Sequence, residues 1–210
     1  MALPGFFLVF EGGDGVGKST QAGLVAEWLV SPEGGGREVV LTREPGGTAV
    51  GRRIRDILQH GEPVDPVAEA LLYAADRAHH VATVVRPALG RGCVVVQDRY
   101  VDSSIVYQGK VRGLGGEVER LSAWATGGLL PDLTIVLDLA AGARRLGVER
   151  DRIERETEHQ ADDLRQGFIE RASAAPARYA VIDAAASVDE VAAVVRRAVA
   201  RAMGHAGGAE

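Results

Sequence analysis

The stretch that most constrains how this chain can fold is Gly12 to Ser19, GGDGVGKS, near the N-terminus. It fits the pattern G-x-x-x-x-G-K-[ST] without a mismatch. The apolar run Phe6 to Phe10 precedes it, and a helical pattern from Gln21 to Val30 follows. In such a strand–loop–helix unit, the loop amides turn inward around a phosphate and the helix N-terminus adds its positive dipole end. The pattern therefore predicts a binding site for a nucleoside triphosphate.

The lysine of this loop stands out in an arginine-rich chain. Lys18 and Lys110 are its only lysines. A compact ammonium grips a phosphate as a point charge, and the planar fork of arginine does not replace it. We expect Lys18 to reach the β- and γ-phosphate oxygens and Ser19 to offer its hydroxyl to Mg²⁺. The alternative is a glycine-rich turn that happens to contain a lysine, but the flanking strand and helix favour the phosphate site.

The loop also carries an extra carboxylate, Asp14, although its ligand is an anion. This side chain can cap a turn, or it can face a substrate hydroxyl or a metal ion. The residues alone leave both interpretations open. Switches, motors and kinases share loops of this kind, so the loop does not identify what receives the phosphate.

Valine-rich apolar runs recur along the chain at residues 6–10, 38–42, 93–97, 133–139 and 179–183. Short runs of this composition are typical of buried parallel strands, and the segments between them are long enough for helical crossovers. The pattern predicts an α/β fold with one five-stranded parallel sheet flanked by helices. We expect a single domain over residues 1–203, a surface turn at 31–36 and a frayed tail at 204–210.

Charge and composition limit the classes of partner. A net charge of −5 argues against a general nucleic-acid surface. The sequence shows neither an apolar run of membrane-spanning length nor a secretory signal pattern, so we expect a cytoplasmic protein without membrane contact. The single cysteine, Cys93, lies in the apolar run CVVV, which favours a buried structural thiol over a reactive one.

Four further stretches carry polar residues near predicted strand ends or in the helices between them, where the ligand crevice of an open α/β sheet lies. They are TREPGGT (42–48), LLYAADR (71–77), QDRYVDSSIVYQG (97–109) and DRIERE (151–156). Combined with the aspartate-containing loop, they resemble the motifs of the thymidylate kinase family over most of the chain. The resemblance implies a P-loop nucleoside monophosphate kinase fold, phosphorylation of dTMP to dTDP by ATP with Mg²⁺, and a homodimer.

The resemblance also implies roles for the loop residues. The acceptor is already a phosphate dianion, so the reaction needs positioning and charge neutralisation rather than a strong general base. Asp14 is expected to fix the sugar end of the substrate. The residues expected to bind ATP are Gly12, Gly13, Asp14, Gly15, Val16, Gly17, Lys18, Ser19 and Thr20.

Tyr73 and Arg77 are four residues apart in a helical segment, so they share one face. Without the resemblance they fit core packing and a surface charge. The resemblance implies that Tyr73 stacks on thymine and that Arg77 bonds its O4. It also places the nucleoside site at the segment after the third strand. The residues expected there are Ser103, which alone fits an N-cap equally well, and Ser104, Tyr107 and Gln108, whose spacing predicts one shared helical face.

The remaining site residues bear on the acceptor phosphate and the metal. Arg99 resembles the family arginine that grips the monophosphate, and Arg55 resembles one that contacts the same group. Asp98 at a strand end is expected to hold the Mg²⁺ shell with Ser19. Glu44, followed by Pro45 in the substrate loop, resembles a carboxylate near this phosphate and its metal. The neighbouring Arg52 and Arg53 are expected to be solvated.

The family implies a lid, which falls at residues 142–157 here. Gly15 occupies the loop position where some members carry a catalytic arginine, so the migrating charge needs an arginine from elsewhere. Arg150 and Arg152 are the candidates, and the sequence does not decide between them. A solvated helical face is the ordinary alternative for such an arginine run. Many bacterial relatives have an aromatic residue just after this stretch, where this chain has Gln160.

Three alternative functions remain at this point. A deoxynucleoside kinase would need a carboxylate base and fewer acceptor-side arginines, so Arg55 and Arg99 favour a phosphorylated acceptor. An ATP-dependent switch would need no base pocket, and its ATP consumption would not depend on dTMP. The third alternative is a degenerate nucleotide-binding paralogue, which the intact motifs disfavour.

Overall fold

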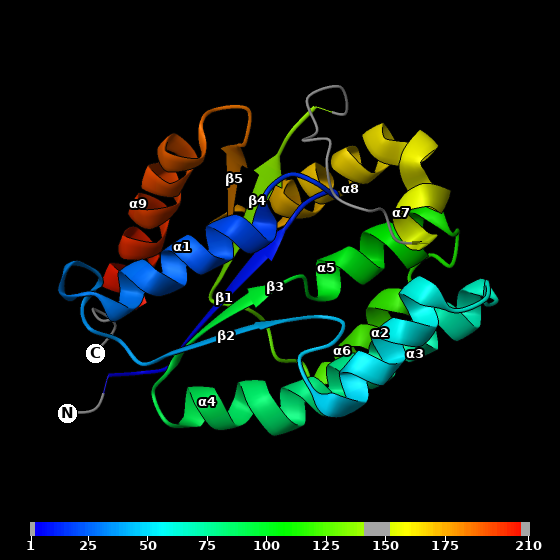
Figure 1. Cartoon of the computed structure of the whole chain (residues 1–210), viewed down its shortest axis with the longest axis horizontal. Helices are drawn as coiled ribbons and strands as arrows, with labels where there is room; N and C mark the ends of the chain where they lie inside the picture. The colour runs from blue at the N-terminus through cyan, green and yellow to red at the C-terminus, as the bar shows by residue number, and fades with distance from the viewer. Residues whose placement is uncertain (1–2, 141–151, 207–210) are drawn as a thin grey trace.

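The structure, a computed structural model of the chain, describes residues 3–140 and 152–206. Its centre is a five-stranded sheet in the order β2-β3-β1-β4-β5 (Figure 1). Every neighbouring pair of strands is parallel. The strands are β1 (Phe6–Glu11), β2 (Val39–Arg43), β3 (Val94–Asp98), β4 (Leu133–Asp138) and β5 (Tyr179–Asp183). The predicted parallel α/β sheet is therefore confirmed, with strand ends within about one residue of the apolar runs.

The central strand β1 divides the hydrophobic core into two layers. Successive side chains of a strand point to opposite faces. Phe6, Leu8 and Phe10 pack in one cluster with α1 and α9, whereas Phe7 and Val9 pack in a second cluster that includes Val85 and Ala88. Figure 1 shows α1 and α9 on one side of the sheet and α4 on the other. Cys93 is buried in the second cluster, as expected.

The helical elements connect the strands as crossovers. The α-helices are α1 (Lys18–Val30), α2 (Ala49–His60), α3 (Pro66–His80), α4 (Arg86–Gly90), α5 (Val101–Ser104), α6 (Glu117–Thr126), α7 (Arg152–Thr157), α8 (Ala161–Ala174) and α9 (Val188–Ala206). Two π-helical segments, η2 (Val81–Val85) and η3 (Ile105–Val111), continue α3 and α5. Single 3-10 turns are η1 (Pro32–Gly34), η5 (Glu158–Gln160) and η6 (Pro176–Arg178).

Of two segments whose bounds the sequence predicts, the C-terminal tail needs a correction and the lid lies mostly outside the described residues. Helix α9 runs to Ala206, so the predicted frayed tail from residue 204 begins inside a helix. Of the predicted lid at 142–157, only residues 152–157 belong to the described part of the chain.

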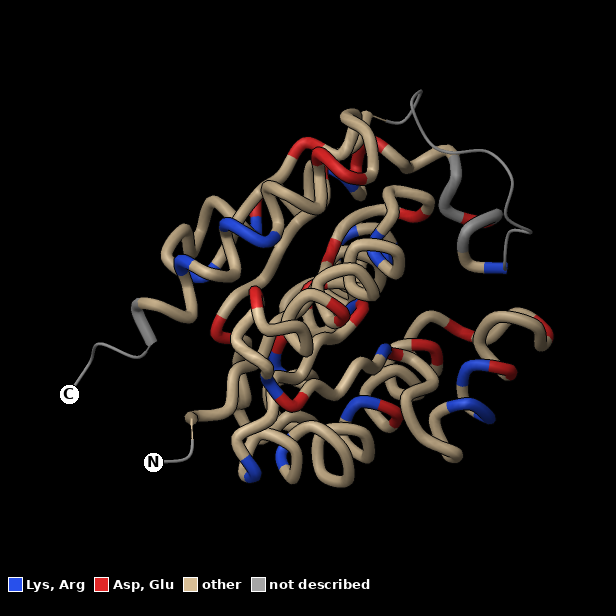
Figure 2. The backbone as a smooth tube through the Cα atoms, turned by 60° about the vertical axis from the view of Figure 1, so that its left-hand side comes forward, with Lys and Arg blue, Asp and Glu red and all other residues tan. Residues whose placement is uncertain are grey.

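Acidic and basic positions are mixed along the helices in the view of Figure 2. None of the helices described is long and apolar enough to cross a membrane.

Candidate active site

The candidate site lies at the carboxyl ends of the central strands, where parallel strands present their loops at one edge of the sheet. The register pairs Phe10 with Asp98 and Glu11 with Val136, so β1, β3 and β4 end side by side. The phosphate loop (Gly12–Thr20) leaves β1 at this edge and leads into α1. Segments far apart in the sequence are thus brought to one place by the sheet order.

The backbone of the phosphate loop has the shape that its glycines predict. Gly12, Gly15 and Gly17 have φ values of 134°, 73° and 95°, a region that L side chains rarely adopt. A Cβ at Gly12 would also meet the Leu137 carbonyl oxygen at 2.6 Å. The loop continues into the first turn of α1, which begins at Lys18. Backbone amides and a helix dipole therefore converge where the motif predicts a phosphate.

Lys18 is buried, and its Nζ donates a hydrogen bond to the Gly13 carbonyl oxygen at 2.6 Å. Burial, followed by the nearby positive charge of Arg99, lowers the pKa of Lys18 to about 8. The ammonium is thus held inside the loop in an environment that disfavours its charge. Phosphate oxygens would favour that charge.

The predicted metal ligands Ser19 and Asp98 do meet. The Ser19 hydroxyl donates to Oδ2 of Asp98, and Oδ1 of Asp98 is buried without a hydrogen-bond partner among the described residues. Hydroxyl and carboxylate oxygens suit Mg²⁺, which keeps several waters and takes substrate phosphate oxygens. The described residues contain no group of three or more His, Cys, Asp or Glu that could form an all-protein metal cage. The pair fits a magnesium ion shared with a nucleotide.

Glu44 does not contact this pair, and its role as a metal ligand stays a prediction. Its carboxylate is buried, with Oε2 accepting from Arg77 Nε at 2.8 Å and Oε1 lying 2.8 Å from His80 Nδ1. Both oxygens are thereby committed to buried partners. Sequence reasoning missed His80, which bridges Glu44 and the Thr42 hydroxyl (2.7 Å). A histidine three residues after Arg77 on α3 was the available signal.

Asp14 and Arg99 form the centre of the site. Arg99 Nη2 donates to Asp14 Oδ1, and the Tyr107 hydroxyl donates to Asp14 Oδ2 at 2.6 Å. Arg99 Nη1 also donates to the Ser103 hydroxyl at 3.1 Å. Arg99 has a φ of 66°, an uncommon conformation for a residue with a side chain. Four predicted site residues, one from the phosphate loop and three from the stretch 97–109, are therefore in contact.

Glu11, the last residue of β1, is a site component that sequence reasoning missed. Its Oε1 accepts from the Tyr100 and Ser103 amides at 2.8 and 3.1 Å, and its Oε2 accepts from the Ser103 hydroxyl at 2.6 Å. Burial, with the charge of Asp102, raises the pKa of Glu11 to about 7. The signal was a carboxylate that ends an apolar run. Glu11 fixes the start of the segment that carries Ser103.

Arg77 is nearly inaccessible, with 2% of its surface exposed. Besides Glu44, its guanidinium donates to the Tyr100 carbonyl and the Ser104 hydroxyl at 3.0 Å, and to the Ser122 hydroxyl at 3.3 Å. These four bonds leave one of the five guanidinium N–H groups, on Nη1, outside the contacts of the described residues. Tyr73 lies one turn earlier on α3 and is partly buried.

The nucleoside segment departs from the predicted single face. Ser104 contacts Arg77, and the Gln108 amide donates to Glu69 at 2.9 Å, so both meet α3. Tyr107 contacts Asp14 of the phosphate loop instead. From Ile105 the segment is a π-helix, whose wider turn separates position 107 from positions 104 and 108.

Arg55 lies beneath the loop that follows β2. Its Nη1 donates to the Pro45 carbonyl at 3.1 Å, and a Cβ at Gly46 would meet the Arg55 side chain at 3.1 Å. The glycine thus allows the loop to pass close to this arginine. Arg52 and Arg53 are exposed, as the sequence predicts.

The two lid candidates have different outcomes. Arg150 lies outside the described residues. Arg152 opens α7 and is buried, where its guanidinium donates to the Leu58 carbonyl and to Glu156 rather than to the phosphate loop. Nearby, Ile153 packs in one cluster with Leu164 and Phe168. This apolar packing is present although Gln160 replaces the aromatic residue of many relatives.

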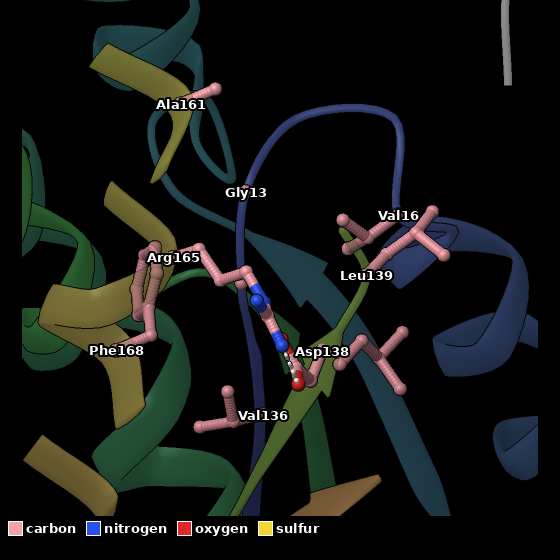
Figure 3. Close-up of a pocket in the computed structure, with 10 residues that line it drawn as sticks. Gly13, Val16, Val136, Asp138, Leu139, Ala161, Arg165 and Phe168 are labelled. Atoms are coloured by element: carbon pink, nitrogen blue, oxygen red, sulfur yellow. Dashed lines mark hydrogen bonds and ion pairs between the residues drawn. The ribbon is translucent and has the colours of Figure 1, made fainter. Parts of the chain in front are cut away.

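A small pocket lies on the β4 side of the phosphate loop (Figure 3). Arg165 from α8 spans it and pairs with Asp138 through Nε–Oδ1 and Nη2–Oδ2 distances of 2.5 and 2.8 Å. Sequence reasoning did not single out Arg165. The pocket is lined by Gly12, Gly13, Val16, Val136, Leu137, Asp138, Leu139, Ala161, Arg165 and Phe168.

Comparisons with known proteins agree with one another. The family model for thymidylate kinase matches residues 10–195. A thymidylate kinase of Clavibacter michiganensis is 55% identical over 201 residues, covering 92% of this chain and 94% of the relative. One from Leifsonia xyli is 56% identical over 200 residues, with coverage of 92% and 93%. The crystal structure of thymidylate kinase from Ehrlichia chaffeensis superposes with a TM-score of 0.77 at 30% identity, covering 93% of this chain and 99% of that one.

Proposed function

The chain belongs to the thymidylate kinase family and is a phosphotransferase that converts dTMP to dTDP with ATP in dTTP synthesis, and from that premise we propose which of its residues carry the reaction. One observation supports the assignment of roles above all. The phosphate loop contacts the acceptor-side segment directly, through Asp14, Arg99 and Tyr107. Donor and acceptor subsites therefore share one boundary.

On the donor side, the phosphate loop (Gly12–Thr20) wraps the ATP phosphates with its backbone amides. Lys18 binds the β- and γ-phosphate oxygens as a point charge. Ser19 and Asp98 hold the Mg²⁺ ion, a role that their contact and the partnerless Asp98 Oδ1 support. When bound, the metal neutralises charge on the phosphates during transfer.

On the acceptor side, Arg99 and Arg55 bind the phosphate of dTMP, whose own oxygen is the nucleophile. Asp14 and Tyr107 orient the sugar, supported by their 2.6 Å hydrogen bond. Glu44 acts on the base indirectly, because its carboxylate fixes Arg77. The loop at Pro45 positions Arg55, and Ser103, Ser104 and Gln108 complete the walls of the nucleoside site.

Arg77 reads the base, with Tyr73 as the stacking surface. Its remaining Nη1 N–H can donate to the O4 carbonyl of thymine, whereas cytosine presents an amino donor at that position. Because arginine has no acceptor, cytosine would leave two donors facing each other without partners. The fixed hydrogen bonds of the guanidinium make this preference rigid.

The charge of the migrating phosphoryl group requires an arginine besides Arg99, since the loop carries Gly15. Arg150 stays the residue proposed to supply this positive charge. The test is Arg150→Ala, which should lower kcat without a matching rise in the KM for dTMP. A solvated arginine would change neither constant.

We also propose a homodimer in the cytoplasm, where ATP and dTMP are both present. Trp124 on α6 is 83% exposed, and Val67 and Leu71 on α3 are exposed as well. Helices α3 and α6 pack against each other, so these side chains belong to neighbouring elements. A second copy of the chain would cover such apolar surface.

The direct test is a coupled ADP-release assay across all common nucleoside monophosphates and thymidine. We expect saturable ADP release with dTMP and weaker release with dUMP, since one methyl group is worth about 1–3 kcal/mol. Activity with thymidine but not dTMP would indicate a deoxynucleoside kinase. A rate of ADP release that does not change with any monophosphate would indicate an ATP-dependent switch. Either result would overturn the proposal.

A further inference from the structure

A second group of charged residues lies away from the phosphate loop, between α7 and the ends of α2 and α3. It contains two carboxylates and two guanidiniums, Glu69, Glu156, Arg112 and Arg152, named here the α7 charge cluster. Figure 1 shows α7 above α2 and α3 and beside the chain that follows α5. Its members come from α3, α7 and the end of η3, so the cluster joins three elements.

Arg152 is the most enclosed cation of the cluster, with 7% of its surface exposed. Its Nε and Nη2 both donate to the Leu58 carbonyl, at 3.1 and 2.8 Å, and its Nη1 donates to Glu156 at 2.8 Å. The Leu58 carbonyl belongs to the last turn of α2, whose carbonyls have no partner within the helix. A cation there also satisfies the negative end of the helix dipole. Arg152 therefore fastens α7 to the end of α2.

Glu69 is the matching buried anion, with 1% of its surface exposed. It lies 3.5 Å from Arg152 and accepts two hydrogen bonds from Arg112, at 3.2 and 3.3 Å. Arg112 also pairs with Glu156 at 2.5 Å. Each arginine thus contacts both carboxylates, and the charges balance. Removal of one member leaves a buried charge without its partner.

The cluster connects directly to the proposed base pocket. Glu69 accepts a hydrogen bond from Gln108, a residue of the proposed nucleoside wall. Glu69 also lies four residues before Tyr73 and eight before Arg77 on α3, so the three share one helical face. A displacement of Glu69 would therefore move groups that contact the base, without any contact between Arg152 and the phosphates.

We infer that Arg152 is a positioning residue and not a residue that contacts the transferred phosphoryl group. Through Glu69, Glu156 and the end of α2, it fixes α7 to the side chains around the proposed base pocket, which include Arg77, Ser104 and Gln108 and are called here the base-side wall. This inference rests on the proposed dTMP site. It assigns different roles to Arg150 and Arg152, which the sequence leaves as equal candidates for the catalytic arginine. A phosphate contact acts mainly in the transition state, whereas a wall anchor changes the binding of dTMP itself.

The test measures dTMP binding without ATP, by calorimetry, together with steady-state kinetics. In Arg152→Met we expect dTMP affinity to fall about threefold to thirtyfold, with kcat at saturating dTMP reduced less than tenfold. Arg112→Met is the matched variant, because it contacts the same two carboxylates, and it should weaken dTMP similarly. Arg120→Met removes an exposed arginine that pairs with the exposed Glu117, and it should change neither constant.

A double-mutant cycle of Arg152→Met with Glu156→Gln gives the second readout. Residues that act through one network are not additive, so the double variant should resemble the worse single variant. Unchanged dTMP affinity with a hundredfold or greater loss of kcat would overturn the inference in favour of a phosphate contact. A lower Tm with both constants unchanged would overturn it in favour of a purely structural role.

Two controls keep the result interpretable. If Arg152→Met does not fold, Arg152→Lys and Glu156→Gln carry the same test with smaller changes, and Arg152→Lys should retain more dTMP affinity than Arg152→Met. The wild-type chain is measured first. An absence of dTMP binding in the wild type would refute the proposed function, whereas normal wild-type binding with unaffected variants would refute only the anchor.

Discussion

The donor and acceptor ends of the site are built in different ways. The phosphate loop (Gly12–Thr20) is one continuous segment, and its shape resides in the backbone of Gly12, Gly15 and Gly17. The base-side wall is assembled from side chains of distant segments, with Glu44, Arg77, Ser104 and Ser122 in one hydrogen-bond network. On the proposed roles, phosphate recognition is thus a local property of this chain, whereas base recognition depends on its tertiary structure.

The two arginines proposed for the acceptor side, Arg99 at its phosphate and Arg77 at its base, also differ in how firmly they are held. Arg99 and its partner Asp14 are about 20% exposed, so solvent screens this pair and a substrate phosphate can replace the carboxylate at little cost. Arg77 and Glu44 are each 2% exposed, and Arg77 is fixed by three further bonds. On the proposed roles, the base subsite of the acceptor end is preorganised by Arg77, whereas Arg99 can exchange its carboxylate partner for the phosphate of dTMP.

The largest expected effect comes from breaking the donor end. Lys18→Met should reduce kcat by about a thousandfold or more, because the charge that stabilises the transferring phosphoryl group is lost. The coupled ADP-release assay measures this loss, and circular dichroism verifies the fold. Lys110→Met is the matched control, since Lys110 forms an exposed pair with Glu170 and its replacement should leave kcat unchanged. Wild-type turnover in a folded Lys18→Met protein would refute the phosphate role.

The second-largest effect is expected when the acceptor end is disrupted at Arg77. Wild type should reject dCMP by at least tenfold to a hundredfold, because a buried unpaired donor costs about 1–3 kcal/mol. Glutamine can donate or accept, so Arg77→Gln should lose dTMP activity and narrow the dTMP-to-dCMP ratio of kcat/KM, with the KM for ATP little changed. Arg53→Gln, on the exposed face of α2, is the control. An unchanged ratio in Arg77→Gln would remove the base pocket from α3.

The pKa of Lys18, lowered to about 8 by burial and by Arg99, sharpens the comparison. Only the protonated ammonium binds the ATP phosphates well, so kcat/KM for ATP should fall about tenfold per pH unit above pH 8. Bound phosphates favour the charged form, so kcat should stay level to higher pH. A pH series at constant ionic strength measures both profiles. A kcat/KM for ATP that is flat to pH 9.5 would contradict this environment for Lys18.

A smaller effect concerns Asp76, which holds the loop that follows β2. Asp76 accepts from the Gly46 amide at 3.3 Å, and burial, followed by the charge of Glu44, raises the pKa of Asp76 to about 6. The folded state therefore holds this proton more tightly, and the contribution of Asp76 to stability falls as the pH rises from 4 through 6. Asp76→Asn cannot ionise, so its free energy of unfolding relative to wild type should rise by roughly 1–3 kcal/mol across that range.

Denaturant unfolding of Asp76→Asn and wild type at pH 4.5 and pH 7.5 measures this difference. A constant difference between Asp76→Asn and wild type at the two pH values would show that Asp76 titrates normally.

The same contrast explains what the sequence could predict. Strand positions follow from apolar runs, and the phosphate loop follows from a fixed spacing, because both depend on neighbouring residues. Glu11, His80 and Ser122 escaped prediction because their roles arise only when β1, α3 and α6 come together. The buried partners of Glu44 also escaped prediction, because they lie more than thirty residues away along the chain. The π-helix after Ser104 displaced Tyr107 because a helical wheel assumes regular turns.

The most direct test of separate donor and acceptor ends is calorimetric binding of ATP–Mg²⁺ alone and dTMP alone to wild type, Lys18→Met and Arg77→Gln. Lys18→Met should weaken ATP binding at least tenfold and change the Kd for dTMP less than about twofold, because its ammonium lies inside the phosphate loop. Arg77→Gln should do the reverse, because its guanidinium lies in the base-side wall. If either variant weakened both ligands to the same extent, the two ends would form one coupled site and this account would be wrong.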